Sequence, residues 1–379
     1  MRNSQRWLRP APYALCFVLF ACAADPALTP LSTAAPTLTF GPTAIAPTPF
    51  PSLTPPPLNN RTPEPTPTPA PALSQLTFDG CCVQPFFSPD GSQVWFIDKP
   101  SDTQPSGIWG VSATGGEPQF ITEKVGVFSS DGALRAYPEA GQTFVERVAT
   151  GERWPVPAAG RAVAISPDGA QVAWQTASST ENFDRRLVEV WVARVDGSEA
   201  RVAARILGGA LGGWFPDSAR LLISGRDSAE TKPYLAALNL ADGARTVIAT
   251  GLNIRGAVIS PNGSWLAYTI SFSGDAARDG LWVVRSDGAA ARRLSHFGAY
   301  RWRSDDRLLI VPLEATSGSH RLIEVAASDG SSHPLTDPRA LAFRIAAGDW
   351  ALSSDGNRLV FVNAADRNLW LIELPPIVP

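Results

Sequence analysis

The chain of 379 residues is poor in the side chains that bind transition metals, with four cysteines and three histidines. The cysteines are Cys16, Cys22, Cys81 and Cys82. Their spacing fits neither a zinc site nor a framework of several disulfides. We therefore expect no metal site and no cofactor. We expect the adjacent pair, Cys81 and Cys82, to be two buried thiols. The alternatives are a strained disulfide within the pair, a redox role and a link to another chain.

The histidines are equally uninformative about catalysis. They are His296, His320 and His333. No two of them have the spacing of a helical metal motif. We expect an exposed imidazole without a catalytic role in each case, and convergence of His296 and His320 at the mouth of a central channel is the functional alternative.

Charged residues make up only 18% of the chain, and the formal net charge is −3. This composition provides no basic field, so we expect no binding to nucleic acid. No long stretch has the apolar period of a helix, whereas twelve tryptophans and 31 glycines favour aromatic-rich strands and tight turns. The sequence therefore predicts an all-β protein.

Residues 1–22 have the pattern of a secretory signal: Arg2, Arg6 and Arg9 precede an apolar run at 11–21 that is too short to span a membrane. The end of this run resembles the lipobox of bacterial lipoproteins, and it predicts a lipid on Cys22. The alternative is an ordinary signal peptide. Residues 23–72 hold 15 of the 35 prolines and ten threonines, which predicts an extended disordered linker.

From residue 73 onward a short unit recurs, and residues 165–174 are its clearest copy. Ser166, Pro167, Asp168 and Gly169 are typical of a tight turn between two antiparallel strands. Seven copies occur at intervals of 37 to 50 residues, anchored at Asp90, Asp131, Asp168, Asp217, Asn262, Asp305 and Asp355. This period is typical of a propeller blade of four strands, so we expect a seven-bladed β-propeller over residues 73–379.

Apolar residues recur four and six positions after each anchor, and only the second copy, with Arg135 and Tyr137, departs from this rule. An apolar residue also precedes each turn and is expected to pack between blades. The last copy ends after its third strand, and residues 73–78 have the pattern of a fourth. We therefore expect residues 74–78 to complete the last blade and close the ring.

The unit at residues 87–96, Phe-Ser-Pro-Asp-Gly-Ser-Gln-Val-Trp-Phe, resembles the WD40-like repeat of the TolB β-propeller family. The resemblance covers residues 73–379 and implies an extracytoplasmic propeller that binds proteins or envelope components. Nothing matches the separate N-terminal domain of TolB, so the resemblance is extended to the fold and not to TolB's partners. The chain also resembles the propeller of prolyl-oligopeptidase relatives, but no hydrolase domain follows and no Gly-x-Ser-x-Gly elbow is present.

The repeated carboxylates are expected to cap their own turns rather than to converge on a substrate or calcium ion. Recognition is expected at the opposite end of the blades, where the polar loops vary in length. The candidate binding residues there are Glu181, Asp184, Arg185, Arg226, Asp227, Asp275 and Arg278. No catalytic residue is assigned.

We predict a non-catalytic, monomeric binding or scaffold module at the cell envelope, anchored through Cys22 and recognising an envelope protein or glycan. One alternative is a propeller enzyme, a lyase or hydrolase of polysaccharide, with a cluster of carboxylate, histidine and arginine from different blades. Another alternative is an extracytoplasmic sensor with a small ligand in the central channel.

Overall fold

The computed structural model describes residues 71–178, 182, 185–251, 253–314 and 318–377. Contacts divide the chain into Met1–Glu64 and Pro65–Pro379, and every described residue belongs to the second unit. The described residues form strands and turns and contain no α-helix, which confirms the all-β prediction. None of them belongs to a helix of the length and apolarity that a membrane crossing requires.

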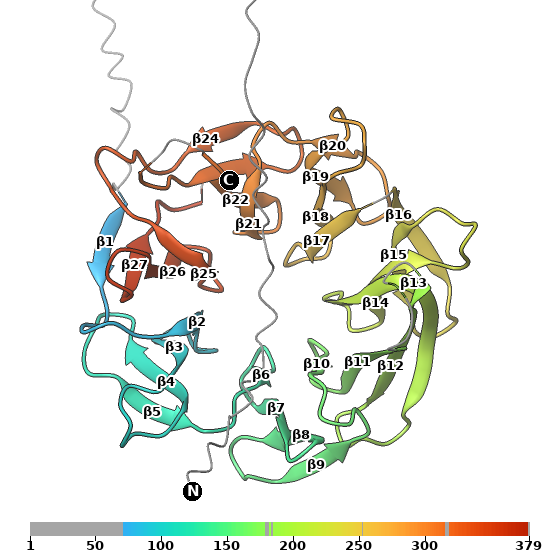
Figure 1. Cartoon of the computed structure of the whole chain (residues 1–379), viewed down its shortest axis with the longest axis horizontal. Coiled ribbons are helices and arrows are strands. Elements are labelled where there is room, and N and C mark those ends of the chain that lie inside the picture. Colours follow the sequence, from blue (N-terminus) through green and yellow to red (C-terminus); the bar gives the residue numbers. More distant parts are fainter. Residues whose placement is uncertain (1–70, 179–181, 183–184, 252, 315–317, 378–379) are drawn as a thin grey trace, which may run out of the picture. The chain divides into compact units, whose positions relative to one another are not determined.

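Five sheets of this unit have four antiparallel strands each (Figure 1). The sheet that contains both ends of the unit has the order β1 (Ala72–Gln75), β27 (Leu369–Glu373), β26 (Arg358–Asn363), β25 (Ile345–Leu352). The next two sheets along the chain are β2 (Val83–Phe87), β3 (Gln93–Asp98), β4 (Gly107–Ser112), β5 (Gln119–Thr122), and β6 (Val127–Phe128), β7 (Leu134–Glu139), β8 (Gln142–Arg147), β9 (Arg153–Val156). Two further sheets are β17 (Ile254–Ile259), β18 (Trp265–Ile270), β19 (Gly280–Arg285), β20 (Arg292–Arg293), and β21 (Gly298–Trp302), β22 (Arg307–Pro312), β23 (Ile323–Ala326), β24 (Ser332–Pro334).

The sixth sheet has seven strands: β10 (Ala164–Ile165), β11 (Gln171–Ala177), β12 (Leu187–Arg194), β13 (Arg201–Trp214), β14 (Arg220–Arg226), β15 (Tyr234–Asn239) and β16 (Arg245–Thr250). The prediction of seven separate four-stranded blades is therefore wrong. The structure has five four-stranded blades in a propeller arrangement and one larger sheet.

The long strand β13 is the reason for this difference. Its first half pairs with β12 as far as Leu207, and the same residue begins the pairing with β14. Gly208 and Gly209 let the chain pass this point without leaving the sheet: Gly208 has φ 58°, and a Cβ at Gly209 would lie 1.8 Å from the carbonyl oxygen of Ser224. A continuous strand thus replaces the loop expected between two copies.

The repeated turn itself has the predicted form. In its clearest copy the Ser166 hydroxyl donates to Asp168 (2.6 Å) and accepts from the backbone N–H of Gln171 (2.9 Å). Gly169 has φ 70°, the conformation for which glycine is favoured. Each of these bonds spans at most five residues, which is why the motif could be identified from the sequence. We call the end of the sheets that carries these turns the turn end, and the opposite end the loop end.

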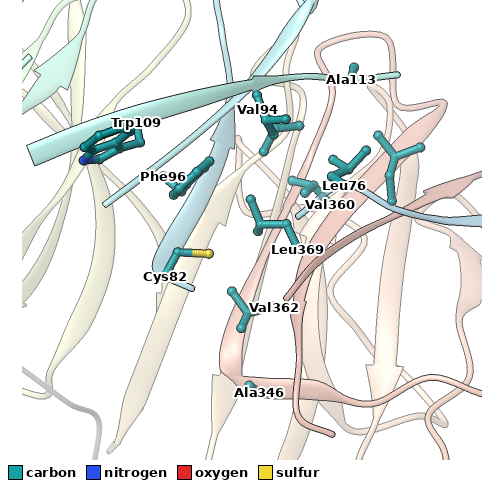
Figure 2. Close-up of a cluster of buried hydrophobic side chains, with 12 residues drawn as sticks. Leu76, Cys82, Val94, Phe96, Trp109, Ala113, Ala346, Val360, Val362 and Leu369 are labelled. Carbon is teal, nitrogen blue, oxygen red and sulfur yellow. The ribbon is translucent and has the colours of Figure 1, made fainter. Parts of the chain in front are cut away.

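The N-terminal segment completes the last sheet, as expected, with β1 antiparallel to β27. The strand lies at Ala72–Gln75 rather than at residues 74–78, because beyond Leu76 the side-chain hydroxyl of Thr77, and not a backbone carbonyl, accepts the N–H of Leu369 (2.9 Å). Asp79 and Gly80 then have positive φ, in the connection to β2. Leu76 extends the contact, since its N–H donates to the Leu369 carbonyl (2.8 Å) and its side chain is 1% exposed. Figure 2 shows Leu76 among Val94, Val360 and Leu369, so one apolar cluster joins the first four-stranded sheet of the chain to the last.

Neighbouring sheets are joined in the same manner elsewhere. The residue before each turn packs against the preceding sheet or strand group, which confirms that prediction for Phe87, Ile165, Ile259, Trp302 and Leu352. Trp302 on β21 donates through Nε1 to the Val258 carbonyl on β17 (3.1 Å), and Trp214 donates to the Ala164 carbonyl (3.0 Å). These two hydrogen bonds connect β21 directly to β17, and β13 directly to β10.

Candidate functional site

The carboxylates at the turn end are structural, as expected. Asp90 accepts from the Ser88 hydroxyl (2.6 Å) and from the N–H of Ser92 (3.1 Å). The hydrogen bond from Ser88 is the main cause that lowers the pKa of Asp90, to about 2. A depression of about 550 Å³ covers this turn and its neighbour at Asp131, but both carboxylates already bind their own turns.

Asp305 is an exception among the predicted turn caps. The turn at residues 303–307 is one residue shorter than the others. Its closing hydrogen bond runs from the Arg303 N–H to the carbonyl four residues later, at Arg307 (2.8 Å), whereas the bond from Ser88 reaches the fifth residue, Gln93. The hydroxyl of Ser304 donates to Asp306 (3.3 Å) and not to Asp305. The anchor role predicted for Asp305 was therefore wrong, and the tighter turn explains why.

The predicted recognition loops are placed as follows. Glu181 and Asp184 lie outside the described residues, as does Cys22. Arg185 is exposed beside Asn182, whose carbonyl accepts its N–H (2.9 Å). Arg226 is the last residue of β14, and its Nη1 donates to the Ala229 carbonyl in the following loop (3.5 Å). No bond between described residues links Arg185 to the other predicted side chains.

Asp227 is occupied by its own sheet. It accepts from the Tyr234 hydroxyl (2.9 Å) and forms an ion pair with Arg245 on the outermost strand, β16. Burial, followed by the hydrogen bond to Asp227, raises the pKa of Tyr234 to about 12. Asp227 therefore fixes the base of its loop rather than presenting a free carboxylate.

Asp275 and Arg278 have a related role in the loop at residues 271–279. Asp275 accepts the N–H of Ala277 (2.9 Å), and Arg278 donates through Nη2 to the Thr250 carbonyl on the neighbouring sheet (3.4 Å). Asp279 accepts the N–H of Ser273 (3.0 Å), which closes the loop on itself. The predicted residues thus build a rigid loop.

That loop displays Phe272, which sequence reasoning missed. Its side chain is 84% exposed, more than any other large apolar side chain of the described residues. Its φ is 55°, and the side chain of Asn253 donates to its carbonyl (2.9 Å). A large aromatic ring held in solvent by a hydrogen-bonded loop is typical of a recognition anchor.

Other exposed apolar side chains gather at the same end of the sheets. Of eleven large apolar side chains that are exposed in the described part of the chain, seven lie at the loop end. They are Phe78, Val83, Val125, Leu187, Phe272, Phe297 and Leu313. Leu313 is 72% exposed, and its N–H donates to the Phe297 carbonyl (2.8 Å), so these two are neighbours.

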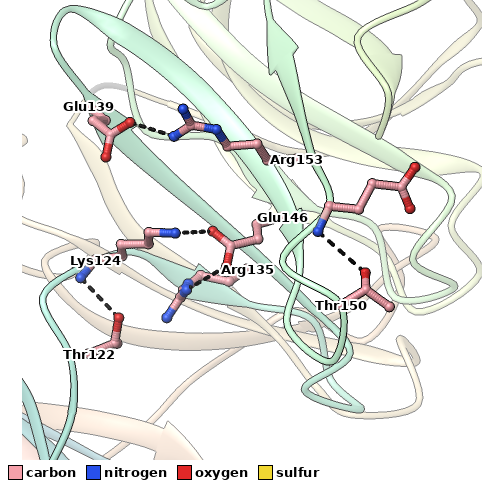
Figure 3. Close-up of polar contacts among 8 residues, drawn as sticks. Thr122, Lys124, Arg135, Glu139, Glu146, Thr150 and Arg153 are labelled. Carbon is pink, nitrogen blue, oxygen red and sulfur yellow. Dashed lines mark hydrogen bonds and ion pairs between the residues drawn. The ribbon is translucent and has the colours of Figure 1, made fainter.

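A charged cluster lies on the sheet β6–β9, where Lys124 reaches from the preceding connection to Glu146 in the turn-end half of β8 (Figure 3). Lys124 lies 2.6 Å from one carboxylate oxygen of Glu146, and Arg135 lies 3.0 Å from the other. Burial alone would raise the pKa of Glu146, but the hydrogen bond from Lys124 and the charges of both cations hold it below its usual value. A depression of about 460 Å³ opens beside Lys124, Tyr137 and Glu139.

The sequence contained a signal for this cluster. Arg135 and Tyr137 occupy the two positions at which the other copies carry apolar residues. Both are buried, and Arg135 replaces apolar packing with an ion pair that ties β7 to β8 and, through Glu146, to the preceding connection at Lys124.

The histidines do not converge. His296 shares a hydrogen bond with Ser332 (3.2 Å), His320 accepts the N–H of Ile345 (3.1 Å), and His333 lies 3.5 Å from Glu324. Burial, and then the charge of Arg344, lowers the pKa of His320. Among the described residues, no group of three or more histidines, cysteines or acidic residues has an arrangement that could hold a metal ion.

Cys81 and Cys82 form a disulfide, so the expectation of two thiols was wrong. The pair lies between β1 and β2, where Cys81 donates its N–H to the Arg367 carbonyl (2.8 Å) and its sulfur lies 3.3 Å from the Thr77 hydroxyl. The disulfide thus belongs to the segment that joins the last sheet to the first.

Comparison of the sequence with protein-family models and with curated proteins gives no match. Solved structures share the fold at low identity. Oligogalacturonate lyase from Vibrio parahaemolyticus is 10% identical with a TM-score of 0.59, covering 81% of this chain and 98% of that one. The β-propeller domain of the Trilobed protease from Pyrococcus furiosus is 13% identical with a TM-score of 0.54, covering 78% and 98%.

A TolB structure is also among the similar structures. The chain described as putative TolB from Agrobacterium tumefaciens is 18% identical with a TM-score of 0.41, covering 69% of this chain and 95% of that one. The similarities to the lyase and to the Trilobed protease domain show a shared propeller fold.

Proposed function

We propose that this propeller is a binding module that recognises a protein or glycan of the cell envelope through its loop end. The observation that carries the proposal is Phe272, an aromatic ring 84% exposed on a loop closed by its own hydrogen bonds. A loop whose backbone is already closed by hydrogen bonds loses little conformational freedom when it binds, so more of the contact energy of its side chains contributes to affinity.

The remaining loop-end side chains suit the rim of such an interface. Leu313 and Phe297 supply further apolar area, and Arg185 is an exposed cation at the same end of the sheets. Interfaces typically have apolar and aromatic centres surrounded by polar groups. The sheets give this surface a rigid support.

The proposal includes a location at the cell envelope, based on the sequence of the N-terminal region. A lipid on Cys22 and an extended linker over residues 23–72 would hold the propeller at the bacterial membrane, in the periplasm or at the cell surface. Tethering would raise the local concentration of the propeller near an envelope partner. The described chain begins beside β1, whose Ala72 pairs with Glu373 near the turn end, so the loop end lies opposite the point where the linker joins.

The test is capture with a matched variant. The full chain is immobilised, incubated with envelope extract and washed with salt; the retained protein or glycan is identified and its affinity measured. Phe272→Ala should weaken that affinity about thirtyfold or more, as expected for a central aromatic anchor. Phe120→Ala, which removes a ring 41% exposed on the outer strand β5, should leave it unchanged. Equal binding by all three proteins would exclude Phe272 as the anchor.

A polysaccharide-degrading enzyme is the second candidate, and Asp349 on β25 favours it. Burial raises the pKa of this carboxyl, against the opposing effects of the Gln84 N–H and Arg367, and a carboxyl that retains its proton is a candidate general acid. Arg301 of the neighbouring sheet bonds to the next residue, Trp350. Incubation with polygalacturonate, followed by assays for unsaturated products and new reducing ends, tests this candidate. Activity that Asp349→Asn abolishes would replace the binding proposal.

A further inference from the structure

The junction between the sheets β2–β5 and β6–β9, neighbours in Figure 1, is packed differently from the other junctions. Every other pair of neighbouring sheets shares a cluster of buried apolar side chains, and no such cluster of described residues joins these two. Leu134 and Ala136 of β7 pack toward the following sheet. Because side chains alternate along a strand, Arg135 and Tyr137 face the sheet β2–β5 instead.

Stability alone does not explain this polar face. A buried ion pair is seldom more stabilising than apolar side chains of similar volume, and the other copies of the repeat carry apolar residues at both positions. Two buried polar atoms are also left unpaired: the Tyr137 hydroxyl and the Nε of Arg135 make no hydrogen bond with another described residue. Departures of this kind from the pattern of a fold are expected where a protein binds a ligand.

Three charged groups surround the Tyr137 hydroxyl. It is close enough to Lys124, Glu146 and Arg153 to interact with their charges, but none of these pairs has the geometry of a hydrogen bond. The Lys124 side chain extends over the Tyr137 ring, with Nζ 5.1 Å from the ring centroid, and reaches Glu146 (Figure 3). This long side chain is 27% exposed and flexible, whereas Tyr137 is fixed in the sheet.

A depression of about 460 Å³ opens here at the loop end, where β7 ends at Glu139. It is lined by Glu123, Lys124 and Val125 of the connection and by Tyr137, Pro138 and Glu139 of β7. Lys124 uses one of its three N–H donors for Glu146. One carboxylate oxygen of Glu139 accepts from Arg153 (2.6 Å), and the other makes no hydrogen bond with another described residue. The lining therefore offers unused donors and acceptors together.

We propose that this depression binds a neutral sugar unit of a glycan. A sugar hydroxyl both donates and accepts, which matches a lining where Lys124 donates, Glu139 accepts and Tyr137 can do either. The charges of Lys124 and Glu139 are already balanced by their own ion pairs, so the lining favours a neutral ligand. Displacement of the Lys124 side chain gives the sugar access to the Tyr137 hydroxyl, and Val125 and Pro138 supply apolar surface for its C–H groups.

The sugar site rests on the proposed recognition of a glycan at the loop end, for which it names the ligand group. Calorimetric titration of the full chain tests it with linear hexasaccharides of β-1,4-linked glucose, of mannose and of N-acetylglucosamine, and with trigalacturonate as a charged comparison. At least one neutral hexasaccharide should bind with a Kd below about 1 mM. Binding of none of the three, or tighter binding of trigalacturonate, would overturn the proposal.

Two acidic residues of the same sheet provide a matched pair of variants. Glu139→Ala should weaken binding of the hexasaccharide about tenfold, because it removes an acceptor from the lining. Glu152→Ala breaks a comparable exposed ion pair, with Arg147 at the turn end, and should leave the affinity unchanged. Equal affinities of the two variants would contradict a contact between Glu139 and the sugar.

Tyr137→Phe separates binding from folding. Its hydroxyl is buried without a partner, so the variant should keep or raise the melting temperature while it weakens sugar binding about tenfold. Tyr234→Phe removes a hydroxyl that donates to Asp227 and should lower the melting temperature. Unchanged sugar affinity in Tyr137→Phe, or a loss of stability as large as that of Tyr234→Phe, would overturn the role of this hydroxyl.

Failure of the sugar site and failure of the Phe272 anchor give different results. Capture from envelope extract that depends on Phe272, without binding of any hexasaccharide, would overturn the sugar site and leave recognition through the loop end standing. Hexasaccharide binding that Tyr137→Phe weakens would support the sugar site even where Phe272→Ala has no effect on capture.

Discussion

The guanidinium of Arg303 lies 2.6 Å from the carboxylate of Glu324, and both side chains are almost fully buried. Arg303 stands where most other copies of the turn have serine, and it also donates to the carbonyls of Gly356 and Pro375. One side chain thus ties the turn of one sheet to the turn of the next and to the C-terminal segment.

Arg303→Met should lower the free energy of unfolding by about 3–5 kcal/mol, because it leaves the Glu324 carboxylate buried without its partner. Chemical denaturation measures this loss. Arg285→Gln is the control: it breaks an exposed pair with Asp287, which should contribute less than about 1 kcal/mol. Similar losses in the two variants would contradict a structural role for the buried pair.

Asp90 should make a turn-specific contribution to stability that depends on pH. Its folded-state pKa is about 2, below the ordinary value of about 4. The lowered pKa means that the stabilisation is present above pH ~4 and is lost as the pH falls toward 2. The melting temperature of Asp90→Asn should therefore lie below that of the wild type at pH 6, and the gap should narrow at pH 2. A difference in melting temperature that does not change with pH would show that ionisation of Asp90 does not contribute to stability.

Leu76→Ala should destabilise the closure of the ring by about 2–5 kcal/mol, the usual cost of removing a fully buried leucine side chain. The cluster around Leu76 contains residues of both the first and last sheets, so the unfolding transition should shift as a whole. Tryptophan fluorescence and far-ultraviolet circular dichroism should report the same shifted midpoint. Leu187→Ala, at a side chain 40% exposed, is the matched control and should have a small effect.

Gly209→Ala should disrupt the long strand β13. The added Cβ would lie 1.8 Å from the Ser224 carbonyl oxygen, so the strand must shift, and we expect a destabilisation of more than about 2 kcal/mol. Gly318→Ala adds the same methyl group where no atom of another described residue outside its chain neighbours lies within 4 Å, and it should be nearly neutral. Comparison of the two denaturation midpoints checks this, and equal midpoints would contradict the close approach.

Cys22→Ala tests the proposed anchor. If a lipid on Cys22 holds the protein at the membrane, the variant should move from the membrane pellet to the soluble fraction. Cys16→Ala, within the apolar run that the signal peptide would remove, is the control and should remain in the pellet. Retention of both variants in the pellet would exclude lipidation of Cys22 as the anchor.

The sequence by itself determined the local turns and the completion of the last sheet. The hydrogen bonds from Ser166 to Asp168 and from Gln171 to Ser166, and the positive φ of Gly169, all lie within the motif, so neighbouring residues suffice to specify the turn. The one distant bond, from the Asp168 N–H to the Ser218 hydroxyl, adds a contact to the next turn. The missing fourth strand of the last copy was equally visible, because an open edge requires a partner and residues 73–78 had the matching pattern. The pairing of β1 with β27 followed, with a small shift in position.

Only the tertiary structure decided how the copies are joined and which polar groups are free. The passage of β13 from its pairing with β12 to its pairing with β14 involves Ser224, whose carbonyl approaches Gly209 from β14. Asp227 and Arg255 are both charged residues in strand or loop segments, yet one is bound to Arg245 and the other has no partner among the described residues. Such contacts join residues far apart in the chain, and local sequence patterns carry no information about them because they arise only when the sheets pack.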